Sequence, residues 1–287
     1  MGNYYLYQIG YYIIRSLPLK AAYAMAICLA DCHYFISQQD RRAVEANFKV
    51  VLNTDTVEPS MVRAVFRNFG KYLVDFFTMT KYLDANYISA HVKVANTAYL
   101  NDILAEGKGC ILISAHLGNW ELAGAVLSKL GYPLSVVALP HKDPRVNEFF
   151  NQQRSFFGTT VIPTTTAIRR CLEHAKANRF VAILAERDFS EHGIVMDFLG
   201  KPTLIPKGAA LFSIKTGAPI VPAFFIREDN DDFHITFQKP IYPPALESNK
   251  IDDEQLKPLI RQYLGTIEEQ IRLYPQQWLL FREFWVK

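Results

Sequence analysis

Continuous apolar runs alternate with amphipathic segments along the chain from residue 92 onward. The apolar runs predict buried β-strands at 109–115, 134–138, 159–162, 180–184 and 219–226. The amphipathic segments predict helices at 120–130, 144–157, 167–177 and 208–215. Strands that are apolar on both faces and alternate with helices form parallel sheets that are covered on both sides. The predicted fold class is therefore α/β, with a mostly parallel central sheet flanked by helices.

The segments before and after this region have a helical pattern. Between residues 40 and 80, apolar residues recur every three or four positions, and Pro59 suits the first turn of a helix. A final helix is predicted over 252–285, where Trp278, Phe281 and Trp285 recur at helical spacing and are expected to pack on the core. The interval 185–206 connects a predicted strand to a predicted helix, and we interpret it as a long functional loop.

Residues 3–37 are strongly apolar, with five tyrosines among the first twelve residues of the chain. Tyrosine favours boundaries where its ring is dry and its hydroxyl is wet. The longest charge-free run, residues 1–14, is shorter than the roughly 18–20 residues that a spanning helix needs. We predict that residues 1–38 form hydrophobic, membrane-anchoring helices at the bilayer interface, and that residues 39–287 form the second domain. A helix that caps the core and a short or tilted span are the alternatives.

Composition excludes several classes of protein. Half of the 287 residues are apolar and 21% are charged, which argues against disorder. A formal net charge of +3 is too small to indicate a nucleic-acid partner. The four cysteines form no CxxC pattern, which predicts buried free thiols in a reducing compartment and a cytoplasmic catalytic face. Walker, GxGxxG and HExxH motifs are missing from the sequence, so neither a cofactor nor a metal is predicted.

The segment GCILISAHLGNWELAG (109–124) places a histidine between a buried strand and a helix. Gly118 gives the connecting turn conformational freedom, and Asn119 suits the N-cap of the helix. His116 and Glu121 can meet only if His116 lies in the turn, because on one helix they would point about 140° apart. A carboxylate on one imidazole nitrogen makes the other nitrogen a general base. We therefore predict a catalytic His116–Glu121 pair, with backbone N–H groups of the turn facing the developing oxyanion.

Other polar residues are placed by the same pattern. Arg187 and Asp188 follow the buried run 180–184, so we expect them at the sheet edge where ligands bind in open α/β folds. Lys207 lies in GKPTLIPKG (200–208), whose glycines and prolines predict a stiff turn. The predicted substrate-binding residues are Asn119, Arg187, Asp188 and Lys207. Three further histidines have no comparable partner and are interpreted as surface residues: His141, His174 and His192.

Five sequence blocks, in order, resemble those of the late acyltransferases of lipid A biosynthesis (lauroyl/myristoyl type) and the related phosphatidylinositol mannoside acyltransferases. HLGNWE (116–121) is similar to the HxxxxD/E block of the wider glycerolipid acyltransferase superfamily. The other blocks are RRAVEANF (41–48), NQQRSFFGTTVI (151–162), LAERDF followed by GIVMDFLGKPTLIPKGAALFSIKTGAPIVP (184–189 and 193–222), and YPQQWLLF (274–281). The resemblance covers nearly the whole chain and implies a glycerolipid acyltransferase-like fold.

The resemblance implies transfer of a fatty acyl group from acyl carrier protein or coenzyme A to a glycolipid hydroxyl at the cytoplasmic face of the inner membrane. A lipid A precursor is the expected acceptor, and a phosphatidylinositol mannoside or an ornithine lipid is the alternative. The resemblance places the base at His116, its partner at Glu121, and an active-site arginine for the thioester oxyanion or an acceptor phosphate at Arg154. The expected co-substrate is the acyl thioester, with no further cofactor.

One departure leaves the partner of the histidine open. Lipid A enzymes tend to have Asp-Gln, and the mannoside enzymes Asp-Arg-Asp, where this chain has Glu186-Arg187-Asp188. Glu186 or Asp188 is therefore the alternative to Glu121 as the acid beside His116, and the acceptor is open as well. Two other functions fit the same residues: a thioesterase that uses the dyad on water, and a lipid-binding scaffold without catalysis.

Overall fold

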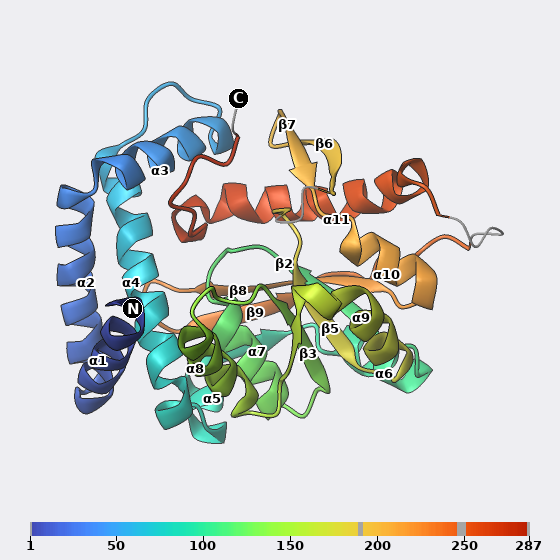
Figure 1. Cartoon of the computed structure of the whole chain (residues 1–287), viewed down its shortest axis with the longest axis horizontal. Helices are drawn as coiled ribbons and strands as arrows, with labels where there is room; N and C mark the ends of the chain where they lie inside the picture. The colour runs from blue at the N-terminus through green and yellow to red at the C-terminus, as the bar shows by residue number, and fades with distance from the viewer. Residues whose placement is uncertain (1, 189–191, 246–250, 286–287) are drawn as a thin grey trace.

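A seven-stranded sheet organises the described part of the chain, in the order β1-β9-β8-β2-β5-β3-β4 (Figure 1). The computed structural model describes residues 2–188, 192–245 and 251–285. The strands of this sheet are β1 (Val92–Ala95), β2 (Cys110–Ser114), β3 (Leu134–Ala138), β4 (Thr160–Pro163), β5 (Phe180–Leu184), β8 (Ile220–Arg227) and β9 (Phe233–Phe237). Strands β8, β2, β5, β3 and β4 are parallel, and β9 runs antiparallel to β8. The predicted mostly parallel α/β sheet is confirmed.

Helices cover both faces of this sheet, as the apolar strands predict (Figure 1). The helices of the α/β region are α6 (Ala98–Glu106), α7 (Trp120–Lys129), α8 (Pro144–Ser155), α9 (Ala167–Lys176), α10 (Gly208–Thr216) and α11 (Asp253–Leu273). Alternate residues of β2 are buried on opposite faces of the sheet. Ile111 and Ile113 are buried in the core cluster that includes α9, α10 and α11, and Leu112 is buried in the one that includes α7.

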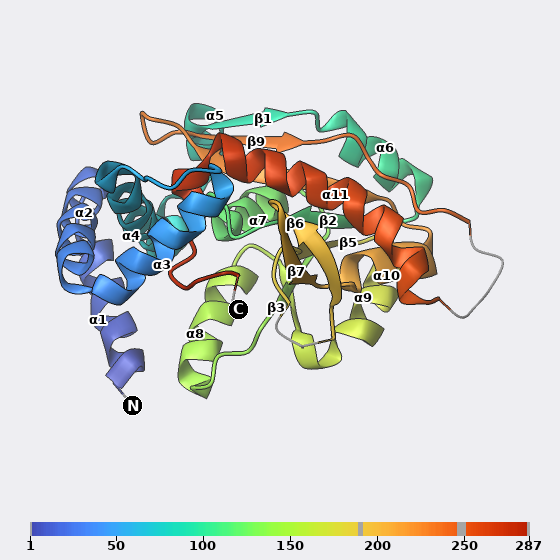
Figure 2. The same ribbon diagram turned by 90° about the horizontal axis from the view of Figure 1, so that it is seen from above.

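Five helices precede the α/β region and pack at one end of the sheet (Figure 2). They are α1 (Gly2–Ser16), α2 (Leu19–Ile36), α3 (Gln38–Val51), α4 (Pro59–Tyr82) and α5 (Ala85–His91). The helical segment predicted for 40–80 is therefore two helices. Helix α4 packs along α2, and Asp31 of α2 accepts hydrogen bonds from both Arg63 and Arg67 of α4 at 2.6–2.8 Å.

The first two helices keep large apolar side chains on the outside. On α1 and α2 the exposed large apolar residues are Tyr5, Leu6, Ile9, Tyr12, Ile13, Leu29, Phe35 and Ile36. Among the described residues, Leu19–Ile36 is the one helix long and apolar enough to cross a membrane by length and composition, with 22% of it buried. That criterion is also met by core helices and signal sequences, so by itself it is weak support for a span.

Two sequence predictions about secondary structure are wrong. The interval 185–206 contains an antiparallel hairpin of β6 (Ile194–Phe198) and β7 (Lys201–Ile205), while residues 189–191 lie outside the described residues. The final helix ends at Leu273, because Pro275 cannot continue it and instead begins the 3₁₀ turn Pro275–Gln277. Residues 278–285 then run as a tail, in which Trp278 is buried as predicted for core packing.

The four cysteines are free thiols, but only two of them are buried as predicted. Cys110 and Cys171 lie in the core, where burial raises the pKa of Cys171 to about 12. Cys28 and Cys32 are exposed on α2. The prediction of buried thiols is therefore wrong for the α2 pair, because this face of α2 has no protein layer over it.

Candidate active site

The turn between β2 and α7 carries His116 and is fixed by backbone hydrogen bonds to distant segments. The N–H of Gly118 donates to the carbonyl of Gln277 at 2.9 Å, and the N–H of Leu279 donates to the carbonyl of His116 at 2.8 Å. The N–H of Asn119 donates to the carbonyl of Phe225 on β8 at 2.9 Å. The C-terminal tail and β8 therefore determine the position of this turn.

His116 pairs with Glu186, which follows the neighbouring strand β5. The imidazole Nδ1 lies 2.6 Å from Oε1 of Glu186, and the backbone N–H of His116 donates to the same oxygen at 2.9 Å. Glu186 is fully buried, while the side chain of His116 is 21% exposed. Strands β2 and β5 are parallel with Ser114 opposite Leu184, so the residues two positions beyond each strand meet. Sequence reasoning favoured Glu121 as the partner, and that prediction is wrong.

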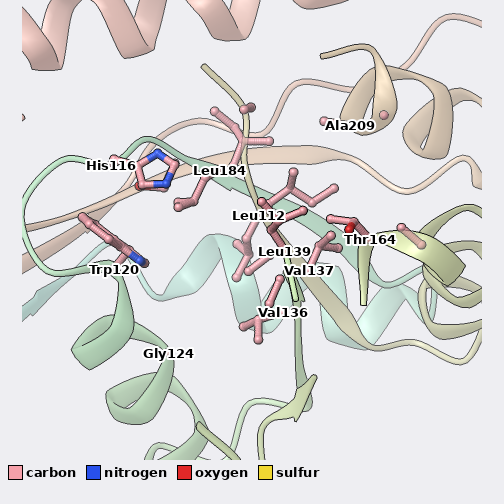
Figure 3. Close-up of a pocket in the computed structure, with 18 of the residues that line it drawn as sticks. Leu112, His116, Trp120, Gly124, Val136, Val137, Leu139, Thr164, Leu184 and Ala209 are labelled. Carbon is pink, nitrogen blue, oxygen red and sulfur yellow. The ribbon is translucent and has the colours of Figure 1, made fainter. Parts of the chain in front are cut away.

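The ring of His116 borders a cavity of about 870 Å³ (Figure 3). Between His116 and Thr164, the picture shows the aliphatic side chains of Leu112, Val137 and Leu139. The lining is mostly apolar and comes from β2, β3, β5, α7, α10 and β8. The size lies within the range of about 300–1,000 Å³ typical of ligand pockets. Each methylene group buried there would contribute about 0.8 kcal/mol.

The whole sequence, residues 1–287, matches the bacterial lipid A biosynthesis acyltransferase family. The chain belongs to this family. It is 24% identical over 286 residues to a phosphatidylinositol mannoside acyltransferase of Mycolicibacterium smegmatis, covering 98% of this chain and 90% of that protein. A phosphatidylinositol mannoside acyltransferase of Mycobacterium tuberculosis is 27% identical over 224 residues, covering 75% of this chain and 70% of that protein. A lipid A biosynthesis acyltransferase of Haemophilus influenzae is 25% identical over 127 residues, covering 44% and 40%.

These matches confirm the resemblance seen in the sequence, and the protein is a lipid acyltransferase. Its chemistry therefore involves an acyl donor and a lipid acceptor. In such a reaction the acceptor must lose a proton and the acyl group must find an apolar environment. In the structure, His116 is paired with Glu186 and borders an apolar cavity.

The electrostatic surroundings of His116 favour its protonated form. Burial alone lowers the pKa of the imidazole, but the Glu186 carboxylate at 2.6 Å raises it by charge and by hydrogen bonding, and the pKa lies above 6.5. Burial opposes ionisation of Glu186, yet the adjacent imidazole keeps the pKa of this carboxyl below its ordinary value. The acyltransferase therefore has a stronger base at this position than an isolated histidine would be.

The pH dependence of acyl transfer should report this pair. Only neutral His116 can accept a proton, so kcat/KM should rise with pH through a midpoint above 6.5. Glu186→Gln removes the negative charge that raises the pKa of His116, while the burial that lowers this pKa remains. The midpoint of the residual activity should therefore move to lower pH. Steady-state rates measured from about pH 5 to pH 8, where histidine titrates, will check this. An unchanged or higher midpoint in Glu186→Gln would contradict the pairing.

Glu121 forms an ion pair with Arg154 instead of contacting His116. The guanidinium of Arg154 donates from Nη2 to Oε1 at 2.6 Å and from Nε to Oε2 at 2.9 Å. Both side chains are nearly buried and line the same cavity as His116. Burial lowers the pKa of Arg154, but the charge of Glu121 more than offsets this and keeps the guanidinium protonated. The pair forms a polar site in an otherwise apolar wall.

The predicted substrate-binding residues divide into two groups. Arg187, Asp188 and Lys207 line the cavity, as their positions after β5 and before α10 predict. Asp188 accepts a hydrogen bond from the N–H of Gly193 at 2.8 Å, and Lys207 lies 2.9 Å from Asp253. Asn119, also predicted to bind substrate, is 2% exposed and does not border this cavity. Its amide bonds the helix and Asp75 instead.

The sequence predicted that backbone N–H groups of the turn face the developing oxyanion, and three of these groups have other partners in the structure. Those of His116, Gly118 and Asn119 already donate to Glu186, Gln277 and Phe225. Because each N–H has a single proton, these groups are not available to a substrate in this conformation. Of the three, only the N–H of Gly118 is engaged by the C-terminal segment, through Gln277, while Glu186 and Phe225 accept the other two.

Several cavity residues were missed from the sequence. His141 and His192 both line the cavity, although His192 is exposed as predicted and His141 is only partly exposed, and His174 lies 2.7 Å from the hydroxyl of Ser135. Tyr72 of α4 also lines the cavity, and no local motif marks it. The position of Trp120 inside HLGNWE was the available signal for its ring, which packs edge-on against His116. Across the described ranges, no group of three or more His, Cys, Asp or Glu has a metal-binding arrangement.

Proposed function

We propose that this protein transfers a fatty acyl group from an acyl thioester, carried by acyl carrier protein or coenzyme A, to a hydroxyl of a glycolipid. The observation that carries the proposal is the His116–Glu186 pair beside an apolar cavity of about 870 Å³. The cavity receives the acyl chain, which brings the thioester carbonyl to the imidazole. We propose a lipid A precursor as the acceptor, and the mannoside acyltransferases among the relatives make a phosphatidylinositol mannoside the comparison to test.

In the proposed mechanism His116 moves a single proton. Nδ1 is engaged by Glu186, so Nε2 takes the proton of the acceptor hydroxyl as its oxygen attacks the thioester carbonyl. Glu186 holds the ring in one tautomer and stabilises the imidazolium that forms. When the tetrahedral intermediate collapses, the carbon–sulfur bond breaks and the proton returns from Nε2 to the departing thiolate. The products are the acylated glycolipid and a free thiol.

The remaining cavity residues are assigned to binding. Arg154, balanced by Glu121, is proposed to steady the thioester oxyanion or an anionic group of the acceptor in the cavity wall. Arg187, Asp188 and Lys207 are proposed to contact the polar part of a substrate at the carboxyl edge of the sheet. No further cofactor enters this mechanism.

We also propose that residues 1–38 attach the enzyme to the cytoplasmic face of the inner membrane. The exposed apolar side chains of α1 and α2 support this, because monomeric soluble proteins rarely expose so many together. Helix α1 also packs against α8. The ring of Tyr7 contacts Phe150, and the ring of Tyr11 contacts Phe149. One face of α1 is therefore bound to the domain that holds the cavity, and the other is left for lipid.

The deciding experiment incubates the purified full chain in detergent with palmitoyl-coenzyme A or palmitoyl-acyl carrier protein. Each donor is combined with an under-acylated lipid A precursor or with a phosphatidylinositol mannoside. We expect release of one thiol for each acyl group that mass spectrometry finds on the glycolipid. Thiol release without any acceptor would favour a thioesterase, and glycolipid binding without thiol release would favour a non-catalytic scaffold.

A further inference from the structure

A buried polar cluster lies directly behind the turn that carries His116. It consists of Asp75 on α4, Tyr23 on α2, Arg227 at the end of β8, and Asn119 in the turn. Asp75 is 4% exposed and Asn119 is 2% exposed. A buried ion pair is often no more stabilising than well-packed apolar side chains of similar volume. The cluster therefore calls for an explanation other than stability.

The Asp75 carboxylate determines which way the amide of Asn119 faces. Nδ2 of Asn119 donates to Oδ2 of Asp75 at 2.6 Å, while Oδ1 accepts the N–H of Leu122 at 3.0 Å as the N-cap of α7. A carboxylate only accepts hydrogen bonds, so it selects the NH₂ side of the amide. The reversed amide would set oxygen against oxygen at Asp75 and NH₂ against N–H at Leu122.

The other members of the cluster hold Asp75 and reach the turn by a second route. Tyr23 donates to Oδ1 of Asp75 at 2.5 Å, and Arg227 pairs with Oδ2. The backbone of Arg227 exchanges two hydrogen bonds with the side chain of Gln277, at 3.0 and 2.8 Å. Gln277 in turn accepts the N–H of Gly118 at 2.9 Å. Two consecutive residues of the turn, 118 and 119, are thus tied to one cluster.

We propose that Asp75 is a positioning residue for His116. Through Asn119 and, by way of Arg227 and Gln277, through Gly118, it fixes the turn so that the imidazole meets Glu186 and borders the cavity. Reacting groups must be placed closely, because a misplacement of about 1 Å costs on the order of 10²-fold in rate. This inference rests on the proposed role of His116 as the base, but the geometry it describes can be measured without turnover.

Three variants separate positioning from general stability. Asn119→Ser keeps an N-cap oxygen for α7 and leaves the Asp75–Arg227 pair intact, but it removes the bond between the turn and Asp75. Asp75→Asn replaces the selecting carboxylate. The matched control is Asp31→Asn, since Asp31 joins α2 to α4 through Arg63 and Arg67 and does not touch the turn.

The experiment measures palmitoyl-coenzyme A turnover and the His116 ring signal in the full chain in detergent. The Nδ1–H proton resonance of His116 is assigned by its loss in His116→Ala. We expect Asn119→Ser and Asp75→Asn to lower kcat about 10- to 100-fold with little change in KM, and to shift or broaden this resonance. Asp31→Asn should match the wild type in both properties.

Several results would overturn the proposal. Folded Asn119→Ser with wild-type kcat and an unchanged His116 resonance would do so, and so would an equal loss in Asp31→Asn. If Asp75→Asn does not fold, Asn119→Ser decides the question, because it leaves the ion pair in place. If the wild type shows no His116-dependent thiol release, the proposed function fails, while the resonance of His116 still tests the positioning.

Discussion

Replacing His116 with alanine should lower kcat for acyl transfer by about 10²–10⁴-fold, the contribution typical of a general base. The imidazole borders the cavity and is paired with the buried Glu186 carboxylate, so its loss should remove proton transfer and leave acyl-chain binding intact. Thiol release and acylated product would be measured together. His174→Ala is the matched control, because His174 bonds Ser135 outside the cavity and its loss should leave kcat unchanged.

Glu186→Gln should approach the effect of His116→Ala, whereas Glu121→Gln should affect kcat less. Glutamine keeps the size of the Glu186 side chain but removes the charge that stabilises the imidazolium and selects its tautomer. Glu121 acts on Arg154 and does not contact the ring. A larger loss of kcat in Glu121→Gln than in Glu186→Gln would return the dyad to His116 and Glu121.

Gly118→Ala should destabilise the fold by about 3 kcal/mol or more. Gly118 has φ +67°, a region that costs other residues strain, and an added Cβ would overlap the carbonyl oxygen of Phe225. That carbonyl cannot retreat, because it already accepts the N–H of Asn119. Thermal unfolding monitored by circular dichroism would show the loss, at about 2–4 °C per kcal/mol for a large domain.

Gly107→Ala is the control for the glycine effect. Gly107 has φ +73°, similar to Gly118, but no atom lies within 4 Å of an added Cβ. It should therefore show only the strain of the left-handed region, about 1–2 kcal/mol. Equal losses in the two variants would mean that the close approach of β8 to the turn contributes nothing.

The parallel part of the sheet could be predicted from sequence because its strands are apolar on both faces. Strands β2, β3 and β5 fall within the predicted runs and β8 ends one residue beyond its run, since burial on both sides leaves a continuous apolar signal. Strand β9 and the β6–β7 hairpin were missed. β9 is a five-residue strand at 233–237, and the hairpin lies in a segment rich in glycine and proline that reads as a loop. β6 pairs with β7 and β9 pairs with β8, but no local apolar pattern marks these pairings.

The site could be predicted only in part for the same reason. His116 is marked by its place between a buried strand and a capped helix, which is local information. The choice between Glu121 and Glu186 depends on the register of β2 and β5, which sequence spacing does not contain. Asp75 and Gln277 lie 44 and more than 150 positions from the residues they position, and nothing near them in the sequence indicates that contact.

The hydrogen bonds between residues 277 and 279 and the turn that carries His116 also bear on the order in which parts of the chain fold. A nascent chain can pair β2 with β5 long before residue 279 has left the ribosome. The turn that carries His116 cannot form its hydrogen bonds to residues 277 and 279 until then. These two hydrogen bonds can therefore form only after α11 has been synthesised.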